Sequence, residues 1–454
     1  MTALTILGTL LIVAANAADP LLFRGRRPEG PNVLLVSLDN LRADGLGCYG
    51  AERPTSPAID AFARECVLFE NAHSQSPYTL PSHASFLSSR YPSVNHASIR
   101  GNRLPAARVL GTELFREAGY RTFGIVDTPF LTDRYGLEQG YDHFVGWGRG
   151  GAHIVPAARS RLEKTVGTPF FFFVHIYDIH APYAKDPEYR KMFLDFDYGG
   201  SVSSEGHVLA RWQKMKKEGE DPGFEIAEED GRYLEALYDG GIRSTDDLLV
   251  GLLDDISKGP LGENTIVIIT ADHGEEFLEH GQVLHDDLYR TLTHVPLLIR
   301  LPGGVRGGTR IPDPVGLIDL LPTLIDLTGI PAPVRLDGRS LVPLIEGGER
   351  PDRPVFGEMP RGGGRVAVVR GRWHLVGHPD GERWELYRYG EDPFEQVDLS
   401  ADRPELVDSL RAILDGWLLD LQAQKFEEPH LKAKAADVDE ETRERLRALG
   451  YLDE

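Results

Sequence analysis

The chain reads Val33-Leu34-Leu35-Val36-Ser37-Leu38-Asp39-Asn40 close to its beginning. A mainly apolar run that ends in two polar residues is typical of a strand buried on both faces. Two later stretches share this design: Phe170 to Val174 continues to His175, Asp178 and His180, and Thr265 to Thr270 is followed by Asp272 and His273. Ligands of an open parallel sheet bind outside the carboxyl ends of its strands. We therefore predict an α/β fold that brings these polar residues to one edge.

A loop is predicted to enter a helix within Gln75-Ser76-Pro77-Tyr78-Thr79-Leu80-Pro81-Ser82-His83-Ala84-Ser85-Phe86-Leu87. Thr79 is expected at the cap position, with Pro81 tolerated in the first turn. The unpaired N–H groups and the dipole of a helix start favour an anion, either the alkoxide of Thr79 or a bound ester oxyanion. An ordinary helix cap explains Thr79 on its own. The three strand ends are what point to a site, where a metal could join Thr79.

The composition is that of a soluble globular protein, with 41% hydrophobic and 26% charged residues among 454. This length suffices for one large domain and a smaller one. The formal charge of −21 argues against nucleic-acid or anionic-membrane partners, which need clustered Lys and Arg. An anionic substrate must therefore be drawn in by a local metal and by local His or Arg side chains.

Residues 1–17 are expected to be a signal peptide, because the apolar run from Leu4 to Ala15 precedes the small-x-small triplet Ala15-Asn16-Ala17. The run is too short to span a bilayer. The residues before it contain no Lys or Arg, so an uncleaved N-terminal anchor is the alternative. We expect a periplasmic or secreted protein, attached to a membrane at most through this segment.

The remaining chain divides by its pattern into three parts, the second of which contains a charged insertion. Residues 18–30 read as an exposed leader, and residues 31–330 alternate strands and helices, which predicts a doubly wound, mostly parallel sheet. Residues 184–232 form a charged insertion, which is either a lid over the substrate cleft or a solvated helical insertion. Runs of charged residues usually mark solvated faces and favour the second interpretation. Residues 331–454 are expected to form a smaller α+β subdomain, with strands at Val366 to Arg370, Trp373 to Gly377 and Trp384 to Tyr389 and a helix from Pro404 to Leu419.

Asp39, Asp272 and His273, with the oxygen of Thr79, supply one cation site of mixed oxygen and nitrogen character. Such a donor set suits Mn or Zn better than a site of oxygens alone, while Ca and Mg stay open. Asn40 is either a neutral ligand or a group that supports the ligands. We expect one divalent cation.

Several motifs, in this order, resemble the sulfatase family, which belongs to the alkaline phosphatase superfamily. They are Pro31-Asn32-Val33 with Asp39, Leu41-Arg42-Ala43-Asp44 and Gly47-Cys48-Tyr49-Gly50; Thr79-Leu80-Pro81-Ser82; Asp178-Ile179-His180-Ala181-Pro182-Tyr183; Asp272-His273-Gly274-Glu275 with His280-Gly281; and Val295-Pro296-Leu297. The resemblance extends over most of the chain after the leader. It implies an alkaline-phosphatase-like fold and a metal-dependent ester hydrolase, and it leaves the substrate open.

The departures from the family pattern are as informative as the matches. Formylglycine-dependent sulfatases place Cys or Ser at the nucleophile and Arg four residues later, where this chain has Thr79 and His83. Thr is not a precursor of formylglycine, so no formylglycine is expected. The family's Lys-Trp-His stretch is replaced by Asp127-Thr128-Pro129-Phe130. The chain thus resembles an unmodified, threonine-using branch, for which hydrolysis of phosphorus esters is chemically more natural.

The candidate catalytic residues are Thr79, His83, His180 and His285. A metal-bound Thr79 hydroxyl loses its proton readily and becomes an in-line nucleophile. His180 and His285 are candidates to bind the ester oxygens or protonate the leaving group, although a His bonded only to backbone explains either. We expect His175 to be structural. We expect supporting roles for His280 and Glu275. Arg42 and Asp44 match the family motif, but a salt bridge that fixes the loop explains them equally well.

We expect a hydrolase of sulfate or phosphate esters carried by a small molecule, a glycan or a lipid. One alternative is a transferase that passes a phosphoryl substituent from lipid to glycan, which normally accompanies several N-terminal membrane spans. Another is a binding protein that keeps the fold without catalysis, which the retained Asp39, Asp272 and His273 disfavour.

The sequence leaves open whether Cys48 and Cys66 pair, and neither occupies the nucleophile position.

Overall fold

A computed structural model describes residues 29–449, except 98–101, 147, 166, 185, 349–351, 360–363, 382 and 433. Its centre is an eight-stranded sheet of order β13-β2-β12-β8-β1-β7-β5-β6. The strands are β1 (Asn32–Leu38), β2 (Val67–Phe69), β5 (Arg121–Ile125), β6 (His143–Val145), β7 (Phe170–Ile176), β8 (Thr265–Thr270), β12 (Leu297–Arg300) and β13 (Arg310–Ile311). The five strands from β8 to β6 run parallel, and β12 lies antiparallel to both its neighbours. The predicted mostly parallel sheet is confirmed, while the expected signal peptide and nearly all of the leader lie outside the described residues.

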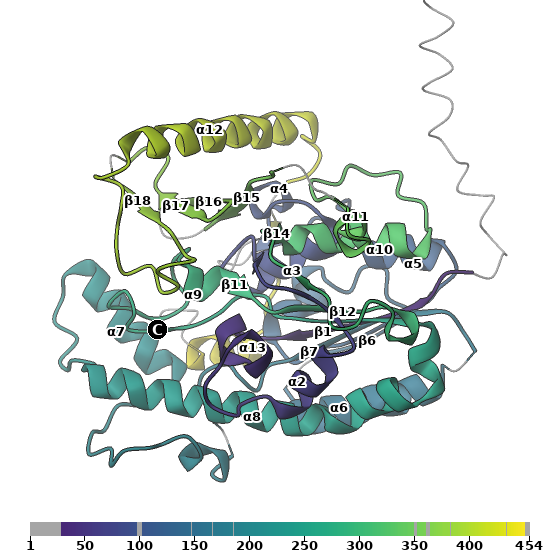
Figure 1. The fold of residues 1–454 in the computed structure, drawn as a ribbon, viewed down its shortest axis with the longest axis horizontal. Helices are drawn as coiled ribbons and strands as arrows, with labels where there is room; N and C mark the ends of the chain where they lie inside the picture. The colour runs from purple at the N-terminus through teal and green to yellow at the C-terminus, as the bar shows by residue number, and fades with distance from the viewer. Residues whose placement is uncertain are drawn as a thin grey trace, which may run out of the picture.

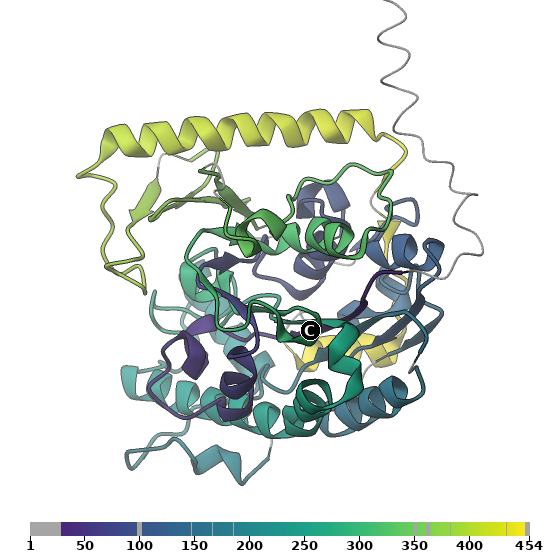
Figure 2. The same cartoon turned by 45° about the vertical axis from the view of Figure 1, so that its right-hand side comes forward.

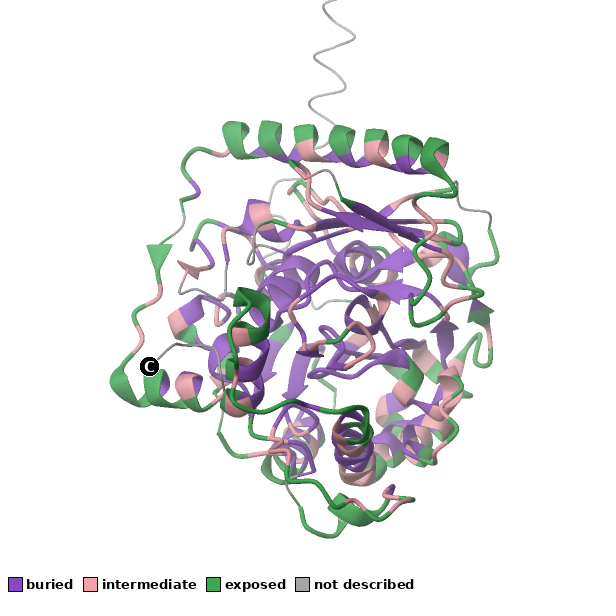
Figure 3. Cartoon of the chain, turned by 90° about the vertical axis from the view of Figure 1, so that its left-hand side faces the viewer, coloured by how far each residue is buried: buried purple, intermediate pink, exposed green. Residues whose placement is uncertain are grey.

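Helices cover both faces of this sheet, which explains why its central strands are almost continuously apolar. The helices α2 (Pro57–Ala63), α6 (Gly151–Glu163) and α8 (Glu228–Lys258) lie on one face, and α3 (Thr79–Ser88), α5 (Gly111–Glu117) and α10 (Leu320–Thr328) lie on the other (Figure 1). Every residue of β7 and β8 is buried. Figure 3 shows the buried strands at the centre, surrounded by helices whose outer faces are exposed.

The remaining elements are short strands and helices that connect or extend these layers. They are β3 (Ala72–His73), β4 (Asn102–Arg103), β9 (Glu276–Phe277), β10 (Val283–Leu284), β11 (His294–Val295), β14 (Val315–Gly316), β19 (Lys434–Ala435), α4 (Pro92–Asn95), α7 (Gly206–Glu218), α9 (Arg290–Thr293), α11 (Val342–Ile345) and α13 (Glu440–Ala448). None of the described helices is long and apolar enough to cross a membrane.

The C-terminal part contains a four-stranded antiparallel sheet beneath a long helix. Its strands are β15 (Val355–Glu358), β16 (Val366–Arg370), β17 (Trp373–Gly377) and β18 (Trp384–Tyr387), and α12 (Pro404–Glu427) lies across them (Figure 2). The three predicted strands are present. The helix continues beyond the predicted Leu419 because Leu421 and Gln424 extend its buried stripe. Trp417 of α12 stacks on Phe356, with ring centroids 4.7 Å apart, and thereby joins helix to sheet.

The charged insertion places α7 beside the β9–β10 hairpin. Gln213 donates to Gln282 at 2.8 Å and accepts from the backbone N–H of Val283 at 3.1 Å. Lys217 forms an ion pair with Asp286 at 2.7 Å. The insertion therefore contacts the segment that leads to His285, at the sheet edge where the central strands end.

Candidate active site

The three strands predicted to carry the site lie side by side and end together. Ser37 of β1 pairs with His175 of β7 on one side and with Thr270 of β8 on the other. Asp39 directly follows Leu38, the last residue of β1, and Asp272 lies two residues after Thr270, the last residue of β8. The structure therefore brings the polar ends of these three strands to one edge of the sheet, as the sequence pattern predicted.

Asp39, Asp272 and His273 form a compact group in which one ligand atom from each lies within 4.8 Å of the others. All three side chains are fully buried. Asp272 Oδ1 accepts the backbone N–H groups of Asn40 and His273, at 3.2 and 3.0 Å. Asp272 Oδ2 has no hydrogen-bond partner among the described residues and lies 3.4 Å from His273 Nε2. A buried carboxylate oxygen in this state needs a compensating positive charge, and a divalent cation fits that need.

His273 is held in the tautomer that a metal ligand requires. Its Nδ1–H donates to the carbonyl oxygen of Gly274 at 3.0 Å, which leaves the Nε2 lone pair facing Asp272. Burial lowers the pKa of His273 to about 4, so the ring is neutral near neutral pH. The hydroxyl of Thr79 lies 3.5 Å from the same Nε2. The candidate nucleophile and the cation group are thus contiguous.

Thr79 is the first residue of α3, and Tyr78 occupies the cap position with extended backbone angles. The prediction that Thr79 caps the helix was therefore wrong by one residue. Thr79 does not act as a cap because its hydroxyl turns to His273 rather than to the helix N–H groups. The residue is fully buried at the positive end of the helix, where negative charge on its oxygen is favoured.

His83 lies one helical turn after Thr79 and faces the protein interior. Its Nδ1–H donates to the Thr79 carbonyl oxygen at 2.7 Å, and its Nε2 accepts from the Ser37 hydroxyl at 3.0 Å. Burial lowers the pKa of His83 to about 3. These contacts attach the start of α3 to β1, so the His83 side chain helps to fix the position of Thr79.

His83, His175 and Asp272 form a second group with the spacing of cation ligands. The nitrogen of His83 that lies 3.7 Å from Asp272 Oδ2 is Nδ1, which also contacts the Thr79 carbonyl. A carbonyl oxygen only accepts, so Nδ1 carries the proton and offers no lone pair to a metal. We interpret this second group as hydrogen-bonded support for the first.

His180 and His285 extend the row of imidazoles beside Thr79. The ring of His285 lies 4.4 Å from that of His273 and 5.7 Å from that of His180. Both bond through Nδ1 to backbone carbonyls, His180 to Ala181 at 2.9 Å and His285 to Pro77 at 3.0 Å. Burial, followed by the neighbouring His273, lowers the pKa of His285 to about 3. The structure thus brings both predicted residues to the site.

Other motif residues stabilise the loops around the site. Arg42 forms ion pairs with Asp44 and Glu279 and donates to the carbonyl oxygen of Glu275, which favours the salt-bridge interpretation of this motif. His280 bonds to Glu276 and stacks on Tyr289 at 3.6 Å between centroids, within the hairpin region.

Two contacts of the candidate cation ligands, to His175 and to Glu275, were not predicted from the sequence. His175 donates its Nε2–H to Asp39 Oδ2 at 2.9 Å, and Glu275 accepts from the side-chain amide of Asn40 at 2.6 Å. Burial raises the pKa of Glu275 to about 8. The signal for His175 was its place at the end of a buried strand, where an imidazole is unusual. Glu275 belongs to the motif Asp272-His273-Gly274-Glu275 and was expected to have a supporting role, but its partner Asn40 was not predicted.

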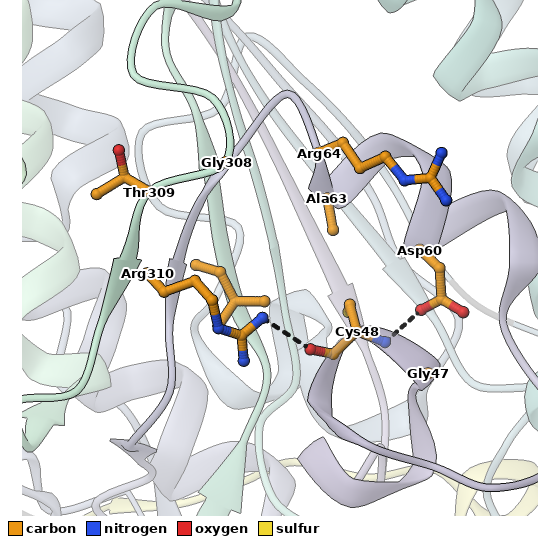
Figure 4. A pocket seen from close by; sticks show the side chains of 9 residues that line it. Gly47, Cys48, Asp60, Ala63, Arg64, Gly308, Thr309 and Arg310 are labelled. Carbon is orange, nitrogen blue, oxygen red and sulfur yellow. Dashed lines mark hydrogen bonds between the residues drawn. The ribbon is translucent and has the colours of Figure 1, made fainter.

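A hollow of about 390 Å³ lies elsewhere, between the segments 47–68 and 308–310 (Figure 4). Arg310 donates to the carbonyl oxygen of Cys48 at 3.1 Å, and Cys48 N–H donates to Asp60 at 2.7 Å. Burial raises the pKa of the Cys48 thiol to about 12, so it is not a reactive thiolate near neutral pH. Cys48 and Cys66 are both free thiols. The hollow contains no residue of the predicted site.

The family profile for sulfatases matches residues 31–330, about two thirds of the chain. The chain belongs to the sulfatase family. A second profile, described as the C-terminal part of N-sulphoglucosamine sulphohydrolase, matches residues 279–424. The chain is therefore an ester hydrolase of the sulfatase family.

Characterised relatives align over most of the chain at low identity. The ulvan-active sulfatase of Formosa agariphila is 28% identical over 360 residues, which cover 70% of this chain and 66% of that protein. The Δ4,5-hexuronate-2-O-sulfatase of Bacteroides thetaiotaomicron is 25% identical over 452 residues, which cover 86% and 89%.

Solved structures show the same fold. A 2-O GAG sulfatase superposes with a TM-score of 0.70 at 23% identity, covering 91% of this chain and 96% of that one. The phosphonate monoester hydrolase of Agrobacterium radiobacter superposes with a TM-score of 0.68 at 21% identity, covering 87% and 96%. The expected alkaline-phosphatase-like fold is confirmed.

Proposed function

We propose that this sulfatase-family enzyme hydrolyses an ester of sulfate or of a phosphorus acid through Thr79, with one divalent cation. Asp39, Asn40, Asp272 and His273 would hold the cation together with the Thr79 oxygen. The observation that carries the proposal is the buried group of Asp39, Asp272 and His273, beside which the Thr79 hydroxyl lies 3.5 Å from His273 Nε2.

The donor set supports a cation. Two carboxylates and a neutral imidazole, with a hydroxyl and an amide within reach, match the mixed oxygen and nitrogen coordination of Mn or Zn, and Ca and Mg remain alternatives. Neutralising the buried carboxylates by a bound cation also removes a large desolvation penalty. When bound, the cation would act as a Lewis acid and lower the pKa of the Thr79 hydroxyl.

The chain's own residues supply the remaining parts of a two-step displacement. Thr79 Oγ1 forms a bond to sulfur or phosphorus while the bond to the leaving oxygen breaks, and a water molecule then attacks the same atom and frees Thr79. The ring of His285 lies beside that of His273 and is followed by the ring of His180, and these two side chains would either bind the ester oxygens or protonate the leaving oxygen. His83 and His175 hold Thr79 and Asp39 in place.

We propose that the preferred substrates are phosphorus esters. A formylglycine hydrate expels sulfate by breaking its own C–O bond, whereas an ester on threonine is released only by a second attack at sulfur or phosphorus. Sulfated Thr79 would therefore persist. Among the relatives, one is named as ulvan-active and another as a hexuronate-2-O-sulfatase, so a glycan is one candidate for the organic part, beside a small molecule or a lipid.

Paired aryl sulfate, phosphate monoester and phosphodiester substrates test this preference. With one leaving group throughout, a phosphorus ester is expected to show the highest kcat/KM. Sustained turnover of the aryl sulfate above every phosphorus ester would contradict it.

The roles of His180 and His285 predict a dependence on the leaving group. Replacing either by Ala is expected to slow esters of poor leaving groups by about 10²- to 10⁴-fold, and activated aryl esters much less. Bound metal, measured by elemental analysis, should be unchanged. Loss of metal together with either side chain would reveal a second cation site.

Two other proposals follow from the sequence. Residues 1–17 are proposed as an export signal that delivers the enzyme to the periplasm or the exterior, which N-terminal sequencing of the mature protein tests. Transfer of a phosphoryl substituent to a glycan remains the alternative reaction, and an acceptor-dependent product would distinguish it from hydrolysis.

A further inference from the structure

The His285 loop, residues 285–289, joins β10 to α9 and carries one of the candidate catalytic side chains. Leu284, directly before it, has a φ of 62°, in the left-handed region that a bulky residue rarely adopts. Such a backbone conformation persists only where surrounding contacts hold it. The position of His285 therefore depends on what holds this loop.

The ring of His285 is oriented by the segment that leads into α3. Its Nδ1–H donates to the carbonyl oxygen of Pro77 at 3.0 Å, which leaves the lone pair on Nε2. The ring lies 4.4 Å from that of His273, between centroids. The hydrogen bond to Pro77 selects the tautomer, and the ring keeps this bond only while the main chain of the loop stays in place.

The C-terminal subdomain contacts the loop through an ion pair that is largely removed from water. Arg365, directly before β16, donates from Nη1 to Asp287 Oδ2 at 2.5 Å. Its Nη2 donates to Glu385 Oε2 of β18 at 2.6 Å, and the same oxygen accepts from the Tyr289 hydroxyl at 3.0 Å. The side chains of Arg365, Asp287 and Glu385 are 13%, 7% and 7% exposed. Two residues of the loop are thus bound to the subdomain.

Asp287 connects Arg365 to the main chain of the loop. Its Oδ1 accepts the backbone N–H of Leu288 at 2.6 Å, while its Oδ2 accepts from Arg365. An Arg–carboxylate pair with little access to water holds its geometry, because breaking it leaves an uncompensated charge. Lys217 and Asp286 pair on the same loop, but their side chains are 39% and 34% exposed, so solvent weakens that constraint. Arg365 therefore supplies the stronger of the two ion pairs on the loop.

We propose that Arg365 is a positioning residue, which holds the loop through Asp287 and so keeps His285 where its Nε2 can act on the ester. This rests on the proposed function, since it assumes the role given to His285. Arg365 acts through the loop and not by contact with the substrate. The C-terminal subdomain thereby becomes part of the catalytic apparatus.

Arg365→Met removes the guanidinium group and keeps a long, unbranched side chain. Turnover of esters with poor leaving groups is expected to fall by about 10- to 100-fold, because a displaced imidazole is less well aligned. Activated aryl esters and bound metal should change little, which is the signature expected of His285→Ala at a smaller size. Arg365→Lys keeps a positive charge beside Asp287 and should retain clearly more activity than Arg365→Met.

Arg353→Met is the matched control. Arg353 also belongs to the C-terminal part, its side chain is 12% exposed, and it pairs with Asp319 at 2.9 Å. It donates as well to the carbonyl oxygen of Asp337 at 3.0 Å. Its loss is expected to lower the melting temperature, as that of Arg365 does, and to leave the dependence on the leaving group unchanged.

The decisive experiment is a double-mutant cycle with His285→Ala, measured on an ester of a poor leaving group. If Arg365 acts through His285, adding Arg365→Met to His285→Ala should cost less than about 2-fold, because the two changes remove one function. The same 10- to 100-fold loss in both backgrounds would overturn the inference and leave Arg365 a purely structural residue. Asp287→Asn, which keeps an acceptor for the Leu288 N–H, repeats the cycle from the other side of the pair if Arg365→Met folds poorly.

The outcomes separate this inference from the proposed function. If His285→Ala slows esters of poor leaving groups and neither Arg365→Met nor Asp287→Asn does, only the role of Arg365 fails. If His285→Ala itself leaves those esters unaffected, the role proposed for His285 fails, and that of Arg365 fails with it.

Discussion

Replacing Thr79 by Ala is expected to lower kcat/KM by about 10³-fold or more on every ester that the enzyme turns over, because the attacking oxygen is lost. Thr79→Ser keeps the hydroxyl and should retain a measurable fraction of the activity. It lacks the methyl group that restricts the side chain to few rotamers, so some loss is expected.

Ser85→Ala is the matched control for this prediction. Ser85 lies on the same buried helix, and its hydroxyl donates to the Pro81 carbonyl at 2.8 Å. Its removal deletes a buried hydroxyl of α3 without touching the candidate site, so activity should be nearly unchanged. Full activity in Thr79→Ala would remove Thr79 from the mechanism and leave water as the attacking group.

Asp272→Ala is expected to lose the bound metal and, with it, about 10³-fold or more of the activity, since the cation supplies several kcal/mol of charge stabilisation. Prolonged dialysis of the natural enzyme against a chelator should have the same effect, reversed by adding back the divalent ion. Elemental analysis and steady-state kinetics measure the two losses.

Asp272→Asn separates the metal from the fold. Asp272 Oδ1 accepts two backbone N–H groups, which an Asn oxygen can also accept. The Asn variant should therefore melt closer to the natural metal-free protein than the Ala variant, while it still binds metal poorly. Full activity of metal-free protein would refute the assignment of this group.

The sequence predicted that the polar strand ends meet at one edge of the sheet because the determining pattern is local. Mainly apolar runs such as Thr265 to Thr270 are typical of strands buried on both faces, and the rule for parallel sheets then predicts that Asp39, Asp272 and His273 lie together. The C-terminal strands were predicted equally well, because short segments of alternating apolar and polar residues between turns are typical of strands.

The sequence did not predict the directions in which individual side chains point. Asn40 and Glu275 are 235 residues apart, and their contact depends on the packing of two loops. His83 was expected beside the reaction, yet its ring turns inward because Ser37 and the Thr79 carbonyl bind its two nitrogens. Thr79 was placed one residue too early in the helix, an error typical of helix boundaries.

The central claim is that Thr79, unmodified, forms the covalent bond to the substrate. The most direct test is peptide mapping by mass spectrometry, first on the resting enzyme and then on enzyme quenched during turnover of an aryl phosphate. We predict threonine at residue 79 in the resting enzyme and a phosphothreonine ester at the same residue during turnover, absent in Thr79→Ala. An aldehyde at residue 79, or an active enzyme that never carries the ester there, would contradict this account.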